Sequence, residues 1–150
     1  MNAEALKKAY LAAALAAGGI ITAIVFYAVL AEALRMTGHR PPLTPPAAYF
    51  LKYVFYLLGF SAIAALKFAA AKLDGKKATP EETVKALTML AVVRAAICEL
   101  PALSGLIMFV LTGYRLDFYL LVVFSIGLEL YHFPRLSSWK ERLRGDFGQL

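Results

Sequence analysis

Four long apolar runs constrain the fold of this chain more than any other feature. A helix needs about 20 mainly apolar residues to cross the ~30 Å hydrocarbon core of a bilayer. Runs of this kind cover about residues 9–34, 47–71 and 84–112, and a shorter one covers about 116–133. Because 61% of the 150 residues are hydrophobic and only 17% are charged, a single soluble domain could not bury them. The sequence predicts an all-α integral membrane protein, a four-helix bundle forming a single transmembrane domain over residues 1–150.

The segments between the runs carry the residues that end helices. They read RMTGHRPPLTPP, KLDGKKATPEE, TGYRLD and FPRLSSWKERLR. In the second segment, Thr79 is placed to cap the next helix, with Pro80 at its first position and Glu82 closing a capping box. In the tail, residues 134–150, bulky apolar and basic residues alternate, which predicts a short C-terminal interfacial helix on the inner membrane surface. A cytoplasmic docking patch is the alternative for this tail.

Lysine and arginine are distributed unevenly between the two sides of the predicted membrane domain. Four lie on one side: Arg35, Arg40, Lys52 and Arg115. Ten lie on the other: Lys7, Lys8, Lys72, Lys76, Lys77, Lys85, Arg135, Lys140, Arg142 and Arg144. Because positively charged segments stay inside, both termini are predicted to be cytoplasmic. Anionic lipid headgroups account for the net charge of +6, so the expected partner is the lipid bilayer and no nucleic acid is required.

Small residues in the first run stand four apart, namely Ala14 with Gly18 and Gly19 with Ala23. This spacing lets two helix backbones approach closely in lipid. Both packing within one bundle and a contact between subunits fit it. We expect a homo-oligomer or association with other membrane subunits, formed through this small-residue face.

The segment RAAICELPALSGLI places a carboxylate, Glu99, inside the third run. It follows Leu87 by 12 residues, or ~18 Å along a helix, which is close to the bilayer midplane. Such carboxylates are costly, and they face the bundle interior, form pairs or hold a proton. Arg94 lies about 140° around the helix from Glu99, so a partner is expected on another helix or subunit. A structural pair and a proton-binding site both remain open.

Three further residues and Arg94 are predicted to shape the surroundings of Glu99. Pro101 interrupts the backbone hydrogen bonds close to the carboxylate and favours a kink. Ser104 and Gly105 leave room for a neighbouring helix. Glutamine is missing from the predicted helices and their hydroxyl residues are scattered, so a proton is favoured over sodium as the ion.

The same segment resembles the proteolipid subunit c of rotary ATPases. The residues that match the ion-carrying helix of that family are Glu99, Pro101, Gly105, Leu106 and Ile107. The polar loop GKKATPEE, with Pro80, is similar to the cytoplasmic loop of the family, and the resemblance covers roughly residues 75–110. It implies that Glu99 carries protons across the membrane.

The chain offers little for other chemistry. Its two histidines, His39 and His132, are predicted near opposite membrane faces and cannot share one haem iron. The sequence has no Cys/His cluster, phosphate-binding glycine loop or Ser/His/Asp arrangement, so no enzyme activity, cofactor or metal is expected. The leading expectation is a proton translocation component. The alternatives are a structural or accessory subunit, with Glu99 and Arg94 in interhelical pairs, and a small proton-coupled transporter working as a dimer.

Overall fold

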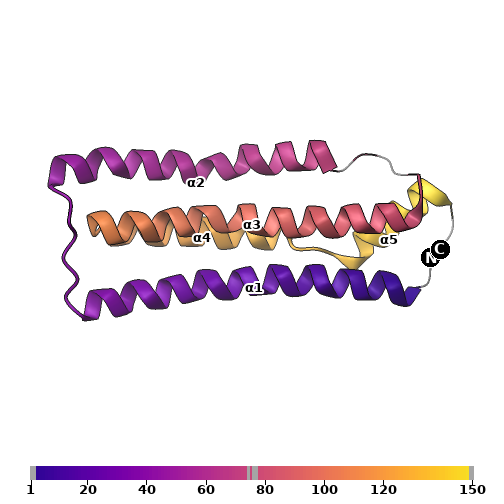
Figure 1. Ribbon diagram of the computed structural model, residues 1–150, viewed down its shortest axis with the longest axis horizontal. Helices are drawn as coiled ribbons and strands as arrows, with labels where there is room; N and C mark the ends of the chain where they lie inside the picture. Colours follow the sequence, from indigo (N-terminus) through magenta and orange to yellow (C-terminus); the bar gives the residue numbers. More distant parts are fainter. Residues whose placement is uncertain (1–2, 74, 76–77, 149–150) are drawn as a thin grey trace.

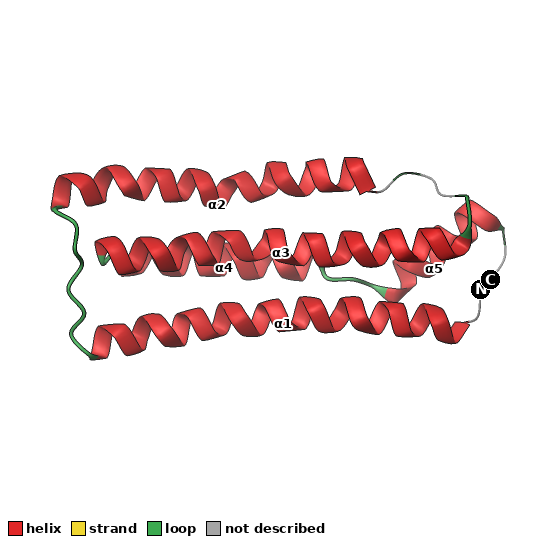
Figure 2. Ribbon diagram, viewed as in Figure 1, coloured by secondary structure: helices red, strands yellow, loops and turns green. Residues whose placement is uncertain are grey.

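A computed structural model describes residues 3–73, 75 and 78–148. All regular secondary structure within these residues is helical (Figure 2). The helices are α1 (Ala3–Met36), α2 (Pro45–Leu73), α3 (Pro80–Thr112), α4 (Arg115–His132) and α5 (Leu136–Phe147). The predicted all-α class is confirmed. Lys76 and Lys77, which the prediction of sidedness uses, lie outside the described residues.

Three of the helices, α1, α2 and α3, are each long and apolar enough to cross a membrane. Helix α4 passes the same test only together with α5, from which it is bent by 43°. The predicted membrane character is therefore confirmed for three helices.

Helix α3 is the centre of the fold. It packs against α1, α2, α4 and α5, and α1 and α2 flank it on opposite sides (Figure 1). Half of its apolar stretch is buried, against about a fifth in α1 and α2, so those two helices expose most of their surface. The start of α1 and the whole of α5 lie at the same end of the molecule (Figure 1).

Two glycines allow the helices beside α3 to pack closely. A Cβ atom on Gly59 of α2 would lie 3.0 Å from the Leu121 side chain and 3.5 Å from the Pro101 Cα atom. A Cβ atom on Gly105 of α3 would lie 3.1 Å from the Leu121 Cβ atom of α4. In lipid, where packing rather than hydrophobicity drives association, such contacts fix the arrangement of helices.

The small residues of α1 divide between two faces. Ala13 and Ala17 are fully buried within the bundle. Gly18 and Gly19, which belong to the predicted small-residue pairs, have no neighbour that an added Cβ atom would meet within 4 Å. The contact between subunits through this face stays a prediction.

Both ends of α3 have the signals expected of a well-defined helix. Thr79 is the N-cap, its hydroxyl accepting a hydrogen bond from the Glu82 N–H at 3.2 Å, and Pro80 is the first helical residue, as predicted. The predicted capping box is formed only in part, because the Glu82 carboxylate accepts from the N–H of Ala78, also at 3.2 Å, one residue before the N-cap. At the other end, Gly113 ends α3 in the left-handed conformation, with φ of +75°.

The predicted C-terminal helix is present as α5, and its place on a membrane surface stays a prediction. Its apolar residues Trp139 and Leu143 are buried in a cluster with Leu6 and Ala13 of α1 and Val84 of α3. The apolar face that was expected to enter the headgroup layer is therefore covered by protein. The physical reason is that residues of α1 and α3 beside the C-terminal end of α4 offer α5 an apolar surface.

Candidate functional site

Glu99 lies on the side of α3 that faces α1. The hydroxyl of Tyr27 in α1 donates a hydrogen bond to its Oε1 atom, and both side chains are partly buried. Among the described residues no cation forms an ion pair with Glu99, and Arg94 in particular does not. The expected partner on another helix is present, and it is a neutral hydroxyl.

A second carboxylate, Glu129 of α4, lies close enough to Glu99 for the two charges to interact. It is only 2% exposed, and its Oε2 atom has no hydrogen-bond partner among the described residues. The Cys98 thiol of α3 faces the same carboxylate. We call Glu99 and Glu129 the carboxylate pair.

The serine one turn before Glu129 joins α4 to α3 at the same level. Ser125 is fully buried, and its hydroxyl donates to the backbone carbonyl of Cys98. Since Cys98 precedes Glu99 in the chain, this bond fixes α4 beside the Glu99 turn. The carboxylate pair is therefore held on two helices that are tied together next to it.

The sequence interpretation missed Glu129. From the sequence alone, a carboxylate this close to a helix end can be satisfied by lipid headgroups or by a lysine such as Lys67 of α2, but Lys67 is exposed and forms no ion pair in the described part of the chain. A usable signal was present, because Ser125, Glu129 and His132 stand at positions i, i+4 and i+7 and so share one face of α4. A polar stripe on one face of an apolar helix marks the side that packs on other helices.

Arg94 belongs to a different site from Glu99. Its Nε atom is buried and has no hydrogen-bond partner among the described residues. The side chain lines a cavity of about 590 Å³ between α3, the C-terminal end of α4 and α5. His132 of α4 lines the same cavity.

The other predicted shaping residues serve helix packing. Pro101 and Ser104 are buried and face Gly59 of α2, and the Ser104 hydroxyl donates to the Pro101 carbonyl at 2.8 Å. Gly105 faces α4. Since Glu99 faces α1, the structure does not bring these three residues to its carboxylate.

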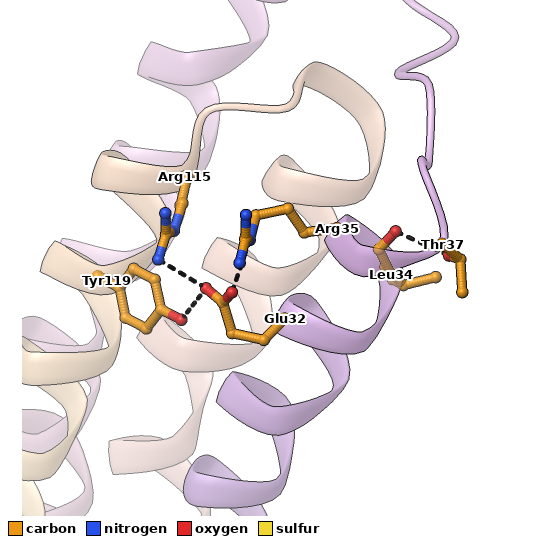
Figure 3. A network of polar contacts seen from close by, with 6 residues as sticks. All are labelled: Glu32, Leu34, Arg35, Thr37, Arg115 and Tyr119. Carbon is orange, nitrogen blue, oxygen red and sulfur yellow. Dashed lines mark hydrogen bonds and ion pairs between the residues drawn. The ribbon is translucent and has the colours of Figure 1, made fainter.

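The carboxylate near the far end of α1 has a quite different environment (Figure 3). Glu32 is bonded by Arg35 at 2.7 Å, by Arg115 at 3.0 Å and by the hydroxyl of Tyr119 at 2.6 Å. The two arginines approach from α1 and α4, so the cluster ties these helices together. Three donors on one carboxylate indicate a structural role.

Asp117, at the start of α4, is held in the same way. The Lys52 ammonium and the Tyr56 hydroxyl, both from α2, each lie 2.7 Å from its Oδ1 atom. This contact attaches α2 to α4 near the same end of the bundle. Glu32 and Asp117 therefore each have a cation, whereas the carboxylate pair has none among the residues that the structure describes.

Within the described residues, no group of three or more histidine, cysteine, aspartate or glutamate side chains could hold a metal ion. No family model, curated protein or solved structure matches this chain. Proposals about function therefore rest on the geometry of the carboxylate pair and of the cavity.

Proposed function

We propose that this protein is a proton translocation component of a membrane, with Glu99 as the proton carrier and Glu129 as its neighbouring site. The observation that carries the proposal is the carboxylate pair on neighbouring helices. Glu99 is bonded to a tyrosine hydroxyl, Glu129 is buried with an unpartnered oxygen, and neither has a cation in the described structure. Two negative charges in a low-dielectric region repel strongly. In the proposed mechanism, a proton bound by one of the two acids relieves this repulsion and can be transferred.

Tyr27 gives Glu99 a donor that suits both protonation states. When Glu99 is ionised, the Tyr27 hydroxyl compensates part of its charge. When Glu99 is protonated, the carboxyl still has an oxygen that accepts from the same hydroxyl. The site can lose and regain a proton without a rearrangement of α1 and α3.

The proposal includes α4 as a fourth membrane span and both termini on the cytoplasmic side. Eighteen residues at 1.5 Å each give α4 a length of ~27 Å, close to the ~30 Å of a hydrocarbon core. Three of the four cations on the predicted outer side, Arg35, Lys52 and Arg115, are paired with carboxylates. The orientation itself is supported by the count of lysines and arginines, ten on the predicted cytoplasmic side against four on the other.

The resemblance to subunit c suggests one form for this component, a ring of identical copies. It predicts a large homo-oligomer that survives detergent extraction. A structural or accessory subunit is the second candidate, and it is favoured by one observation: the Tyr27–Glu99 bond also ties α1 to α3. In that case the protein would co-purify with unlike chains.

Labelling with a hydrophobic carbodiimide tests the proposal, because the reagent modifies protonated carboxyls that are accessible from an apolar phase. We expect modification at Glu99, mapped by mass spectrometry, that is lost in Glu99→Gln. The matched control is Glu32→Gln, which removes an ion-paired carboxylate and leaves Glu99 labelling unchanged. If Glu99 is unmodified at every pH in the folded wild type, the carrier role is refuted and the structural role replaces it.

A further inference from the structure

The cavity beside Arg94 is a second site, separate from the carboxylate pair. It lies between α3, the C-terminal end of α4 and α5. Its volume of about 590 Å³ falls within the range of small-molecule sites, about 300–1,000 Å³. The charged and polar side chains that line it are Arg94, His132, Arg135, Ser138, Glu141 and Arg142.

The lining carries an excess of positive charge. Three arginines stand against one glutamate, which gives a formal charge of +2 with His132 neutral. The Arg142 Nε atom bonds to Asp146 at 3.1 Å, which offsets part of this charge and holds the Arg142 side chain in place. Arg94 and Arg135 provide the remaining positive charge from two different elements.

Arg94 supplies the most specific feature of the cavity. A guanidinium is permanently charged and carries five donors in a planar fork. In Arg94 the Nε donor is buried and has no acceptor among the described residues, although such buried donors are nearly always satisfied. A ligand with several anionic oxygens would satisfy it.

We propose that this cavity binds a phosphate group, supplied by the headgroup of an anionic phospholipid. Phosphate oxygens match the guanidinium fork of Arg94 and the charge of Arg135. The apolar part of the lining, which includes Leu87, Leu90 and Phe133, is suited to the glycerol and upper acyl region. Basic pockets between helices at the cytoplasmic boundary of a membrane protein recognise such headgroups.

The test compares lipid binding by the full-length protein, stripped of lipid in detergent and titrated with phosphatidylglycerol or phosphatidylcholine by native mass spectrometry. We expect the wild type to bind one phosphatidylglycerol and to prefer it over phosphatidylcholine. The double variant Arg94→Gln/Arg135→Gln should bind about tenfold or more weakly, since charge-assisted phosphate contacts are lost. Lys140→Gln is the matched control, because it removes an exposed cation of α5 that does not line the cavity.

Inorganic phosphate is titrated in a separate arm to distinguish the two sources of the phosphate group. Saturable binding of inorganic phosphate that the double variant loses, with no preference between the two lipids, assigns the site to a soluble phosphate and overturns the lipid source. Arg135→Gln alone, at an exposed position, keeps the test valid if the double variant does not fold. Equal phosphatidylglycerol binding by the wild type and the folded variants, or an equal loss in Lys140→Gln, overturns the proposed site.

Discussion

Replacing Glu129 with methionine should make the folded protein more stable and impair proton exchange at Glu99. Methionine is similar in size and flexible, so it can fill the same volume without a polar group. Wild-type Glu129 is 2% exposed and one of its oxygens has no partner in the described structure. If Glu129 destabilises the folded protein, a function that requires its carboxylate explains why the residue is there.

The magnitude follows from that missing partner. A buried polar group without a hydrogen bond costs about 1–3 kcal/mol, and a thiol such as that of Cys98 is only a weak donor. We expect Glu129→Met to raise the free energy of unfolding by about 1–2 kcal/mol. For a chain of this size that corresponds to an increase of about 2–8 °C in the melting temperature.

The chain contains its own reporter for this measurement. Cys98 is the single cysteine and is fully buried, so a thiol-reactive dye modifies it only when α3 and α4 separate. Heating the protein in detergent with such a dye therefore reports unfolding. Glu32→Gln serves as the control. It should lower the melting temperature, since it removes the charge that Arg35 and Arg115 contact.

The Glu129→Met variant also tests the electrostatic coupling between the two acids of the carboxylate pair. Without the neighbouring charge of Glu129, the ionised form of Glu99 is less disfavoured, so carbodiimide labelling of Glu99 at neutral pH should fall. A lower melting temperature for Glu129→Met, together with unchanged labelling of Glu99, would refute both the missing partner and the coupling.

Three further substitutions test the packing that holds the site. Gly59→Val should cost about 1–3 kcal/mol, because a Cβ atom at this position already lies 3.0 Å from Leu121, and early exposure of Cys98 on heating would measure the loss. Gly113→Ala should cost about 1–2 kcal/mol for the left-handed backbone alone, and more because its Cβ atom would lie 2.6 Å from Pro41; an unchanged melting temperature would contradict the turn. Thr79→Ala should cost about 1 kcal/mol through loss of the N-cap, with faster amide hydrogen exchange confined to the first turn of α3.

The fold was largely predictable from hydropathy and from helix-ending residues. Each predicted apolar run lies in one helix, and the cap at Thr79 starts α3 as expected. The helix ends differ from the ends of the predicted apolar runs, because a helix can continue past its apolar segment where another part of the protein packs against it. The first turns of α3, before the predicted apolar run, lie in a segment where Val84 packs with residues of α1 and α5, a contact that sequence periodicity alone does not reveal.

The site was less predictable, since it depends on which faces of the helices meet. Glu99 could be selected because it interrupts a long apolar run, but its partner Tyr27 lies 72 residues away. Glu129 is only four residues from the end of α4, so its position suggested headgroup contact until the structure placed it against α3. Distance along a helix gives a depth in the membrane, whereas burial depends on the neighbouring helices.

The acidic side chains of the bundle differ in their partners, and this difference argues against a purely structural role for the carboxylate pair. Glu32 and Asp117 join α1, α2 and α4 through their side chains. Each of these two carboxylates contacts at least one cation and one tyrosine hydroxyl. Glu99 has only a tyrosine hydroxyl, and Glu129 faces a thiol. Arg94, the cation nearest to them in the sequence of α3, lines the cavity instead. If the pair served only to join helices, a cation or an apolar residue would do so at lower cost, and the two acids are explained better by the proton that they can share.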